Sequence, residues 1–141
     1  MLSEPSDDDL RDLTAKEQWV VGHYPEENRD QYQALGAKLL LLQQILDENW
    51  IKKNDPEHTL KLQCLGATYG AALVQYDECL TWKITTDEYG RDLCLSDRNS
   101  SIRLFPLTMI SKRVEDGEQI EIKSLFVQTL EMLDNARQDA S

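Results

Sequence analysis

The stretch that decides the fold is Leu80–Leu95, which reads LTWKITTDEYGRDLCL. Its first half alternates apolar and polar side chains, with Trp82 and Ile84 on the apolar side, and this period of two is typical of a half-buried strand. The tetrapeptide Asp87–Gly90 is typical of a turn in which Gly90 supplies the positive φ. Because the alternation resumes after the turn, the stretch predicts an antiparallel hairpin.

Further strands are predicted on the C-terminal side of this hairpin. A second turn is expected at 97–100, and Ile102 and Leu104 then alternate up to Pro106. Together these signals predict a three-stranded meander. Ile120 and Ile122 alternate in the same way after the turn residue Gly117, so a fourth short strand is possible there.

The residues before the hairpin have a helical period instead. Ser6 followed by three aspartates predicts a helix start, because a hydroxyl caps the free N–H groups and negative charge suits the helix dipole. Thr14 with Glu17 three residues later is a second capping signature. One bent helix or two short ones, ending near Pro25, are both compatible with this pattern.

Two longer helices are predicted next. The first spans about 27–49, on an apolar stripe that Leu40 and Leu41 widen. The second starts at Pro56 and runs to about Gln75. The stripes consist of Tyr32, Leu35, Leu39, Leu42 and Leu46 in the first and of Leu62, Leu65, Tyr69 and Leu73 in the second.

Gly66 and Gly70 lie one turn apart beside the second stripe. Glycine destabilises a helix, so this pair predicts that another part of the backbone approaches closely. After Pro106, a short helix or an extended segment is expected, and a final amphipathic helix carries Leu125, Phe126, Leu130 and Leu133.

The predicted class is therefore α+β: about three N-terminal helices packed on a small three- to four-stranded antiparallel meander, with a C-terminal helix. Residues 1–141 form one predicted domain, since no linker or repeat divides them. Residues 1–5 and 138–141 are expected to be frayed.

Composition excludes several classes of protein. The chain has 141 residues, 40% of them hydrophobic, and a net charge of −11. Phosphate binding needs clustered Lys and Arg, so this charge argues against nucleic acid as a partner. The apolar runs are far shorter than the roughly 20 residues that a membrane span needs, and the acidic start is unlike a secretory signal. A cytoplasmic location and no membrane association are expected.

The negative charge is concentrated near the N-terminus. Residues 1–31 contain nine acids and three bases, and this charge suits a basic protein partner as well as simple solubility. At the hairpin turn, Tyr89 beside Arg91 is a plausible interface anchor. The candidate partner-binding residues are Asp7, Asp8, Asp9, Asp12, Asp87, Glu88, Tyr89, Arg91, Lys112 and Arg113.

A longer set of residues resembles a bacterial family known as domain of unknown function 3806. The similar stretch is Leu65 to about Phe126. Its motifs are Leu65-Gly66-x-x-x-Gly70, Trp82, Asp87-Glu88-Tyr89-Gly90-Arg91-Asp92, Leu104-Phe105-Pro106-x-Thr108-Met109-Ile110-Ser111-Lys112-Arg113 and Gly117-Glu118. The resemblance implies a helical layer over a small antiparallel sheet. It implies no activity, cofactor or site residue.

No catalytic or metal-binding motif is evident. His23 and His58 lie at predicted helix boundaries without a second ligand at helical spacing, and they are read as surface or capping residues. The residues Cys64, Cys79 and Cys94 are an odd number with no close pair, which is typical of core residues rather than of a disulfide framework or a zinc site.

Two charged clusters leave alternatives open. Asp87, Glu88 and Asp92 suit Ca²⁺ or Mg²⁺, but a solvated turn with one acid paired to Arg91 fits their spacing better. Lys112 and Arg113 suit an anionic ligand or an acidic partner. They suit equally well internal ion pairs with the acids among Glu115, Asp116 and Glu118.

The expected function is accordingly a non-enzymatic protein-binding module without catalytic residues, cofactor or metal. Its partner is expected to be a protein, such as a basic toxin or effector that this chain neutralises as immunity proteins and antitoxins do. One alternative is a housekeeping adaptor. Another is a small-ligand-binding or hydrolase domain that uses Asp87 and Glu88 or Lys112 and Arg113.

Overall fold

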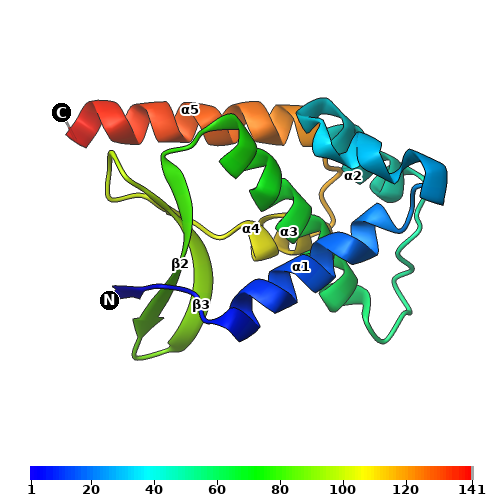
Figure 1. Cartoon of the computed structure of the whole chain (residues 1–141), viewed down its shortest axis with the longest axis horizontal. Coiled ribbons are helices and arrows are strands. Elements are labelled where there is room, and N and C mark those ends of the chain that lie inside the picture. Colours follow the sequence, from blue (N-terminus) through cyan, green and yellow to red (C-terminus); the bar gives the residue numbers. More distant parts are fainter. Residues whose placement is uncertain (141) are drawn as a thin grey trace.

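The computed structural model describes residues 1–140 and has the predicted α+β architecture. A central helix, α3 (His58–Tyr76), lies between α5 (Ile122–Ala140) on one side of the molecule and α1 (Asp7–Val21) on the other (Figure 1). The antiparallel sheet stands at the end of the molecule that also holds the N-terminus. This arrangement confirms helices packed on a small sheet with a C-terminal helix.

The first helix is capped as expected. The backbone N–H of Asp9 donates to Ser6 Oγ at 3.1 Å, and the N–H of Ser6 donates to Asp9 Oδ2 at 2.8 Å, which forms a capping box. The helix then continues unbroken to Val21. Thr14 does not cap a second helix, because its hydroxyl donates to Leu10 O in the preceding turn.

The predicted helix 27–49 is wrong as one element. A 3₁₀ helix, η1 (Glu26–Gln33), is followed by extended backbone at Ala34, and α2 (Leu35–Asp47) starts there. The break has a tertiary cause: the Tyr32 hydroxyl donates to Glu17 of α1 at 2.6 Å and lies 3.0 Å from Thr68 Oγ1 of α3. These hydrogen bonds hold η1 between two helices, so the local apolar period does not decide the direction of the chain.

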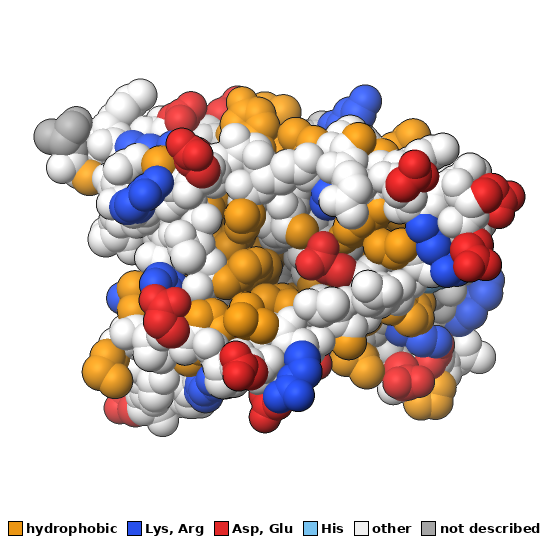
Figure 2. All heavy atoms as spheres, in the orientation of Figure 1, with side chains coloured by type: hydrophobic (Ala, Val, Ile, Leu, Met, Phe, Trp, Pro, Cys, Tyr) orange, Lys and Arg blue, Asp and Glu red, His pale blue; other side chains and the backbone are white. Residues whose placement is uncertain are grey.

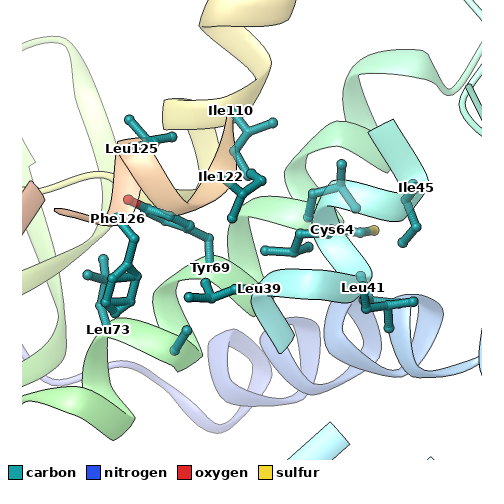
Figure 3. Close-up of a cluster of buried hydrophobic side chains, with 14 of the residues drawn as sticks. Leu39, Leu41, Ile45, Cys64, Tyr69, Leu73, Ile110, Ile122, Leu125 and Phe126 are labelled. Atoms are coloured by element: carbon teal, nitrogen blue, oxygen red, sulfur yellow. The ribbon is translucent and has the colours of Figure 1, made fainter. Parts of the chain in front are cut away.

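Helix α3 supplies the centre of the core. All four residues of its predicted stripe are buried. Tyr69 points towards α5 (Figure 3). Its ring packs edge-on against the ring of Phe126, with 6.0 Å between the ring centroids, and its hydroxyl oxygen lies 2.8 Å from Thr129 Oγ1. Leu41 and Ile45 of α2 close the core from the other side, whereas Leu40, expected to widen the apolar face, is 63% exposed.

The glycine pair of α3 marks a close contact, as predicted. A Cβ on Gly66 would lie 2.3 Å from Pro106 O and 2.7 Å from Leu107 Cα, at the start of α4 (Pro106–Glu115). A Cβ on Gly70 would lie 2.6 Å from the ring of Trp82, so the close neighbour there is a side chain. The segment after Pro106 is therefore a helix that packs directly on the α3 backbone.

The sheet has the order β1-β2-β3-β4. Strands β2 (Leu80–Asp87) and β3 (Gly90–Asp97) form the predicted hairpin, with positive φ at Gly90, and β4 (Arg103–Leu104) completes the meander. The fourth strand is not at Ile120 and Ile122. It is β1 (Leu2–Ser3), which pairs with Thr85 and Ile84, so residues 1–5 are not frayed along their whole length.

The segment 118–121 leads directly into α5 without forming a strand. It is held by Gln43 of α2, whose Oε1 accepts from Ile122 N at 2.7 Å and whose Nε2 donates to Ile120 O at 3.0 Å. One side chain thus takes the place of the expected partner strand. Residues 138–140, expected to be frayed, continue α5, and residue 141 lies outside the described part of the chain.

Candidate interaction surface

The start of α1 and the tip of the hairpin adjoin each other. Arg91 of β3 donates to Asp9 of α1 through two parallel hydrogen bonds, Nη1 to Oδ1 at 2.9 Å and Nη2 to Oδ2 at 2.5 Å. Lys83 of β2 forms a further ion pair with Glu4. Two regions that are 82 residues apart in sequence therefore form one continuous surface (Figure 1).

We call this surface the acidic end and define it by Asp7, Asp8, Leu10, Asp12, Asp87, Glu88 and Tyr89. All of these side chains are exposed. Figure 2 shows acidic side chains, with a few basic ones among them, where α1 begins and the hairpin turns. Tyr89 at the turn is 90% exposed and Leu10 on the outer face of α1 is 46% exposed. A shallow hollow around Leu10, Thr14 and Ala15 lies on that face.

Two of the predicted partner-binding residues, Asp9 and Arg91, bind each other. Hydrogen bonds from Arg91 and from the Ser6 backbone hold the pKa of the Asp9 carboxyl well below its usual range, and the Asp9 side chain is only 14% exposed. Arg91 was expected to pair with an acid of its own hairpin, but its partner is Asp9. The ion pair of Asp9 and Arg91 therefore links the start of α1 to the hairpin within the acidic end.

The distinction between Asp9 and Asp8 is testable by unfolding. Asp9→Ala removes half of the capping box and the partner of Arg91, so the free energy of unfolding should fall by about 1–2 kcal/mol. Asp8, whose side chain is 88% exposed and pairs only with Arg11 in its own helix, provides the matched control. Asp8→Ala should change stability by less than about 0.5 kcal/mol. Equal losses in urea unfolding would contradict this assignment.

The other predicted site residues do not join the acidic end. Arg113 donates to Met109 O of its own helix at 2.9 Å. Lys112 is exposed and has no ion pair within residues 1–140. The expected ion pairs of this basic pair with Glu115, Asp116 or Glu118 are thus absent from the described chain, and the Glu115 carboxylate instead accepts from Thr59 at 3.0 Å.

The hairpin carboxylates form a turn. Asp87 Oδ1 accepts from the Tyr89 backbone N–H at 2.8 Å, while Glu88 and Asp92 are exposed. Across residues 1–140, no three His, Cys, Asp or Glu side chains are grouped in a way that could hold a metal ion.

His23 lies at the end of α1, and two of the three cysteines are buried in the core. His23 Nδ1 donates to Trp19 O at 3.0 Å at the end of α1, and its ring stacks on Trp50 at 5.1 Å. Cys64 and Cys94 are buried core residues, whereas Cys79 is half-exposed, and its sulfur lies 3.2 Å from Asn99 Nδ2.

Helices able to cross a membrane are not found among residues 1–140. No curated protein matches this chain. A solved crystal structure of a protein from Bacteroides thetaiotaomicron VPI-5482 is similar, with a TM-score of 0.72 and 17% sequence identity. The likeness covers 92% of this chain and 47% of that one, so this chain spans less than half the length of its structural relative. At this identity the likeness shows the fold alone.

The family resemblance inferred from the motifs is confirmed over a longer stretch. A family model matches residues 38–126, which begins in α2 and ends in α5. It includes the glycine pair, the hairpin and the Phe105-Pro106 turn into α4. It starts after α1, so the α1 half of the acidic end lies outside the matched region. The chain belongs to the family described as "Domain of unknown function (DUF3806)".

Proposed function

We propose that this protein is a non-enzymatic binding module that recognises a basic protein through its acidic end. The observation that carries the proposal is the junction of α1 with the hairpin through Asp9 and Arg91, which brings the exposed acids at the start of α1 to the hairpin that carries Glu88 and Tyr89. Complementary charge accelerates the encounter of two proteins and disfavours wrong partners.

The acidic end also carries exposed apolar residues, which can contribute binding energy that charge alone does not provide. Binding energy in interfaces is concentrated in a few large side chains, and Tyr is enriched among them. Tyr89 is almost fully exposed at a turn whose backbone is fixed by Asp87, so it loses little conformational freedom on binding. Leu10 offers a second apolar contact on α1. The expected interface has a small aromatic and aliphatic centre with an acidic rim.

Among basic partners, we favour a toxin that the protein neutralises in the cytoplasm. A small, strongly acidic chain of 141 residues with a charge of −11 is suited to cover a cationic active surface by binding alone. This step is an analogy with immunity proteins and antitoxins. A housekeeping adaptor would use the same surface with a harmless partner.

The first experiment captures the partner and maps the surface together. The full chain is used as bait at low and high salt beside a triple variant, Asp7→Lys, Asp8→Lys and Glu88→Lys, and a Tyr89→Ala variant. The matched control is Glu26→Lys, Glu27→Lys and Glu131→Lys, which changes the net charge equally at exposed positions of η1 and α5.

We expect one stoichiometric basic partner whose affinity falls at least tenfold in both surface variants and changes by less than threefold in the control. Binding should also weaken with salt, and less steeply in the triple variant, since exposed charges are screened. Equal losses in the control would remove the acidic end as the binding surface. The toxin assignment is tested separately: the partner expressed alone should stop growth, and co-expression should restore it. A harmless partner would leave the adaptor role.

A further inference from the structure

One edge of the sheet is left open beside the hairpin turn. Strand β3 has 8 residues, but β4 pairs with only Leu95 and Ser96. Continuing this register would place Leu93 opposite Pro106, and Pro106 instead begins α4. Because proline has no N–H to donate to a ladder, the pairing stops before it. Residues 91–93 therefore have no neighbouring strand on this side within residues 1–140, and we call them the open edge of β3.

The backbone groups of Arg91 and Leu93 point towards this open side. In an antiparallel ladder, two residues that face each other either exchange hydrogen bonds or both point away from each other. The partner of Arg91 in β2 is Thr86, whose N–H donates to Met1 O at 3.1 Å and whose carbonyl accepts from the Met1 amino group at 3.2 Å. Since Thr86 bonds to β1 on the far side of β2, Arg91 points away from β2. Leu93, two residues further along β3, points the same way.

The N–H and C=O groups of these two residues have no hydrogen-bond partner on the open side in the part of the chain that the structure describes. The Arg91 side chain is 53% exposed, Asp92 is exposed and Leu93 is half-buried. Unpaired backbone groups on a strand edge are a template for pairing with another chain. Pairing with β2 already holds this row extended, so a segment that binds here meets a pre-formed edge.

The charges beside the open edge select a basic segment. Asp92 and Glu88 are exposed and form no ion pair among the described residues, whereas Arg91 is already neutralised by Asp9. A second copy of this chain fits poorly, because antiparallel pairing about Asp92 would place the two Asp92 side chains directly opposite each other. Like charges in that position destabilise a sheet, and each copy carries a net charge of −11.

We propose that the open edge binds an extended, basic segment of the partner protein, which adds to the sheet as a strand antiparallel to β3. Residues of the segment opposite Arg91 and Leu93 exchange backbone hydrogen bonds with them. The residue between those two lies opposite Asp92, on the other face of the sheet. The segment therefore alternates apolar side chains beside Leu93 with basic ones beside Asp92. This inference rests on the proposed function, since the segment belongs to the same basic partner, and it adds how that partner is held.

The open edge is tested first in the free protein, by NMR measurement of amide hydrogen exchange on the full chain. The N–H groups of Arg91 and Leu93 should exchange at least tenfold faster than those of Asp92 and Cys94, which point towards β2. Equal protection of the two pairs would show that the edge is covered and would overturn the proposal.

The binding probe is a six-residue peptide of alternating lysine and valine, acetylated and amidated at its ends. At saturation we expect one peptide per chain and at least tenfold slower exchange at Arg91 and Leu93, with little change at Asp92 and Cys94. A glutamate–valine peptide should bind at least tenfold more weakly. N-methylation of the valines removes the N–H groups that face β3 and should abolish binding. N-methylation of the lysines, whose N–H groups face solvent, should leave the affinity within threefold.

Two pairs of variants test the same contacts from the protein side. Leu93→Pro removes the outward N–H and should abolish peptide binding, whereas Leu93→Val keeps the N–H and should retain it. Asp92→Lys should weaken binding at least fivefold, and Asp116→Lys, an equal change of charge at an exposed position after α4, should leave it within twofold. Thermal unfolding checks that each variant is folded. If Leu93→Pro is not, the two N-methylated peptides decide the question.

Failure of this inference can be distinguished from failure of the proposed function. A partner that is captured through the acidic end but leaves Arg91 and Leu93 unprotected overturns the strand pairing and leaves the proposed function standing. Peptide binding that is lost equally on methylation of the valines or of the lysines also overturns it. Conversely, the expected peptide results without any captured basic protein would count against the proposed function and support the open edge as a peptide site.

Discussion

Gly66→Ala is expected to lower the free energy of unfolding by about 3 kcal/mol, at the upper end of the usual cost of overpacking. The added methyl group would meet backbone atoms, with Pro106 O at 2.3 Å and Leu107 O at 2.9 Å. Backbone cannot rotate away as a side chain can, so α4 must shift as a whole. The movement would disturb Ile110, which is fully buried in the core.

Gly36→Ala is the matched control. Gly36 lies in α2, and a methyl group added there would have nothing within 4 Å. Alanine is favoured over glycine in a helix by about 1 kcal/mol, so this variant should be as stable as the natural chain or slightly more stable. Urea unfolding followed by circular dichroism measures both. If Gly66→Ala were as harmless as Gly36→Ala, the α3–α4 contact described above would be incorrect.

Arg137→Ala is expected to have a similar effect, a loss of about 3 kcal/mol, because it leaves a buried carboxylate unpaired. Arg137 of α5 donates to Asp97 through Nε at 3.0 Å and Nη2 at 2.9 Å, and to Asp77 through Nη1 at 2.8 Å. The Asp97 side chain is completely inaccessible to solvent. The guanidinium thus fastens the end of α5 to β3 and to the turn after α3.

The pH dependence of stability should change with this substitution. Hydrogen bonds from Arg137 lower the pKa of Asp77, and those from Arg137 and Ser100 lower the pKa of Asp97 against the opposing effect of burial. A carboxyl with a lowered pKa in the folded state stabilises the fold above its unfolded pKa of about 3.9, and this contribution is lost as the pH falls through the folded value. The natural chain should therefore lose stability below about pH 4 more steeply than Arg137→Ala.

Arg29→Ala serves as the control for this prediction. Arg29 is exposed in η1 and forms no ion pair within the described chain, so its removal should change stability by less than about 0.5 kcal/mol. Urea unfolding at pH 7 and at pH 3 compares the three proteins. A pH 7 loss for Arg137→Ala no larger than that for Arg29→Ala would show that the buried pair does not stabilise the fold.

Local signals predicted most elements well. The capping hydroxyl of Ser6, the stripe of α3 and the turn at Gly90 all depend on residues within a few positions of one another. Even the distinction between Asp9 and Asp8 had a signal in the sequence. Asp9 stands three residues after Ser6, which is the spacing of a capping box, whereas Asp8 does not.

Predictions failed where a distant contact overrides the local pattern. The stripe through Tyr32 and Leu35 is continuous in sequence, yet hydrogen bonds from Tyr32 to α1 and α3 turn the chain between them. The alternation at Ile120 and Ile122 lacks a partner strand, because Gln43 supplies the hydrogen bonds with its side chain. In neither case do the residues adjacent in sequence indicate the competing interaction.

By itself, the sequence determined the class of the fold, the positions of α1, α3, α5 and the hairpin, the close contact at the glycine pair and the acidic character of the chain. These properties follow from side-chain periods, caps and turns, which act over a few residues. Only the tertiary structure decided that Asp9 meets Arg91 and that Arg137 meets Asp97, across 82 and 40 positions. With 26 acids and 15 bases in one chain, each pairing depends on how the packed elements place their charges, and composition does not distinguish among them.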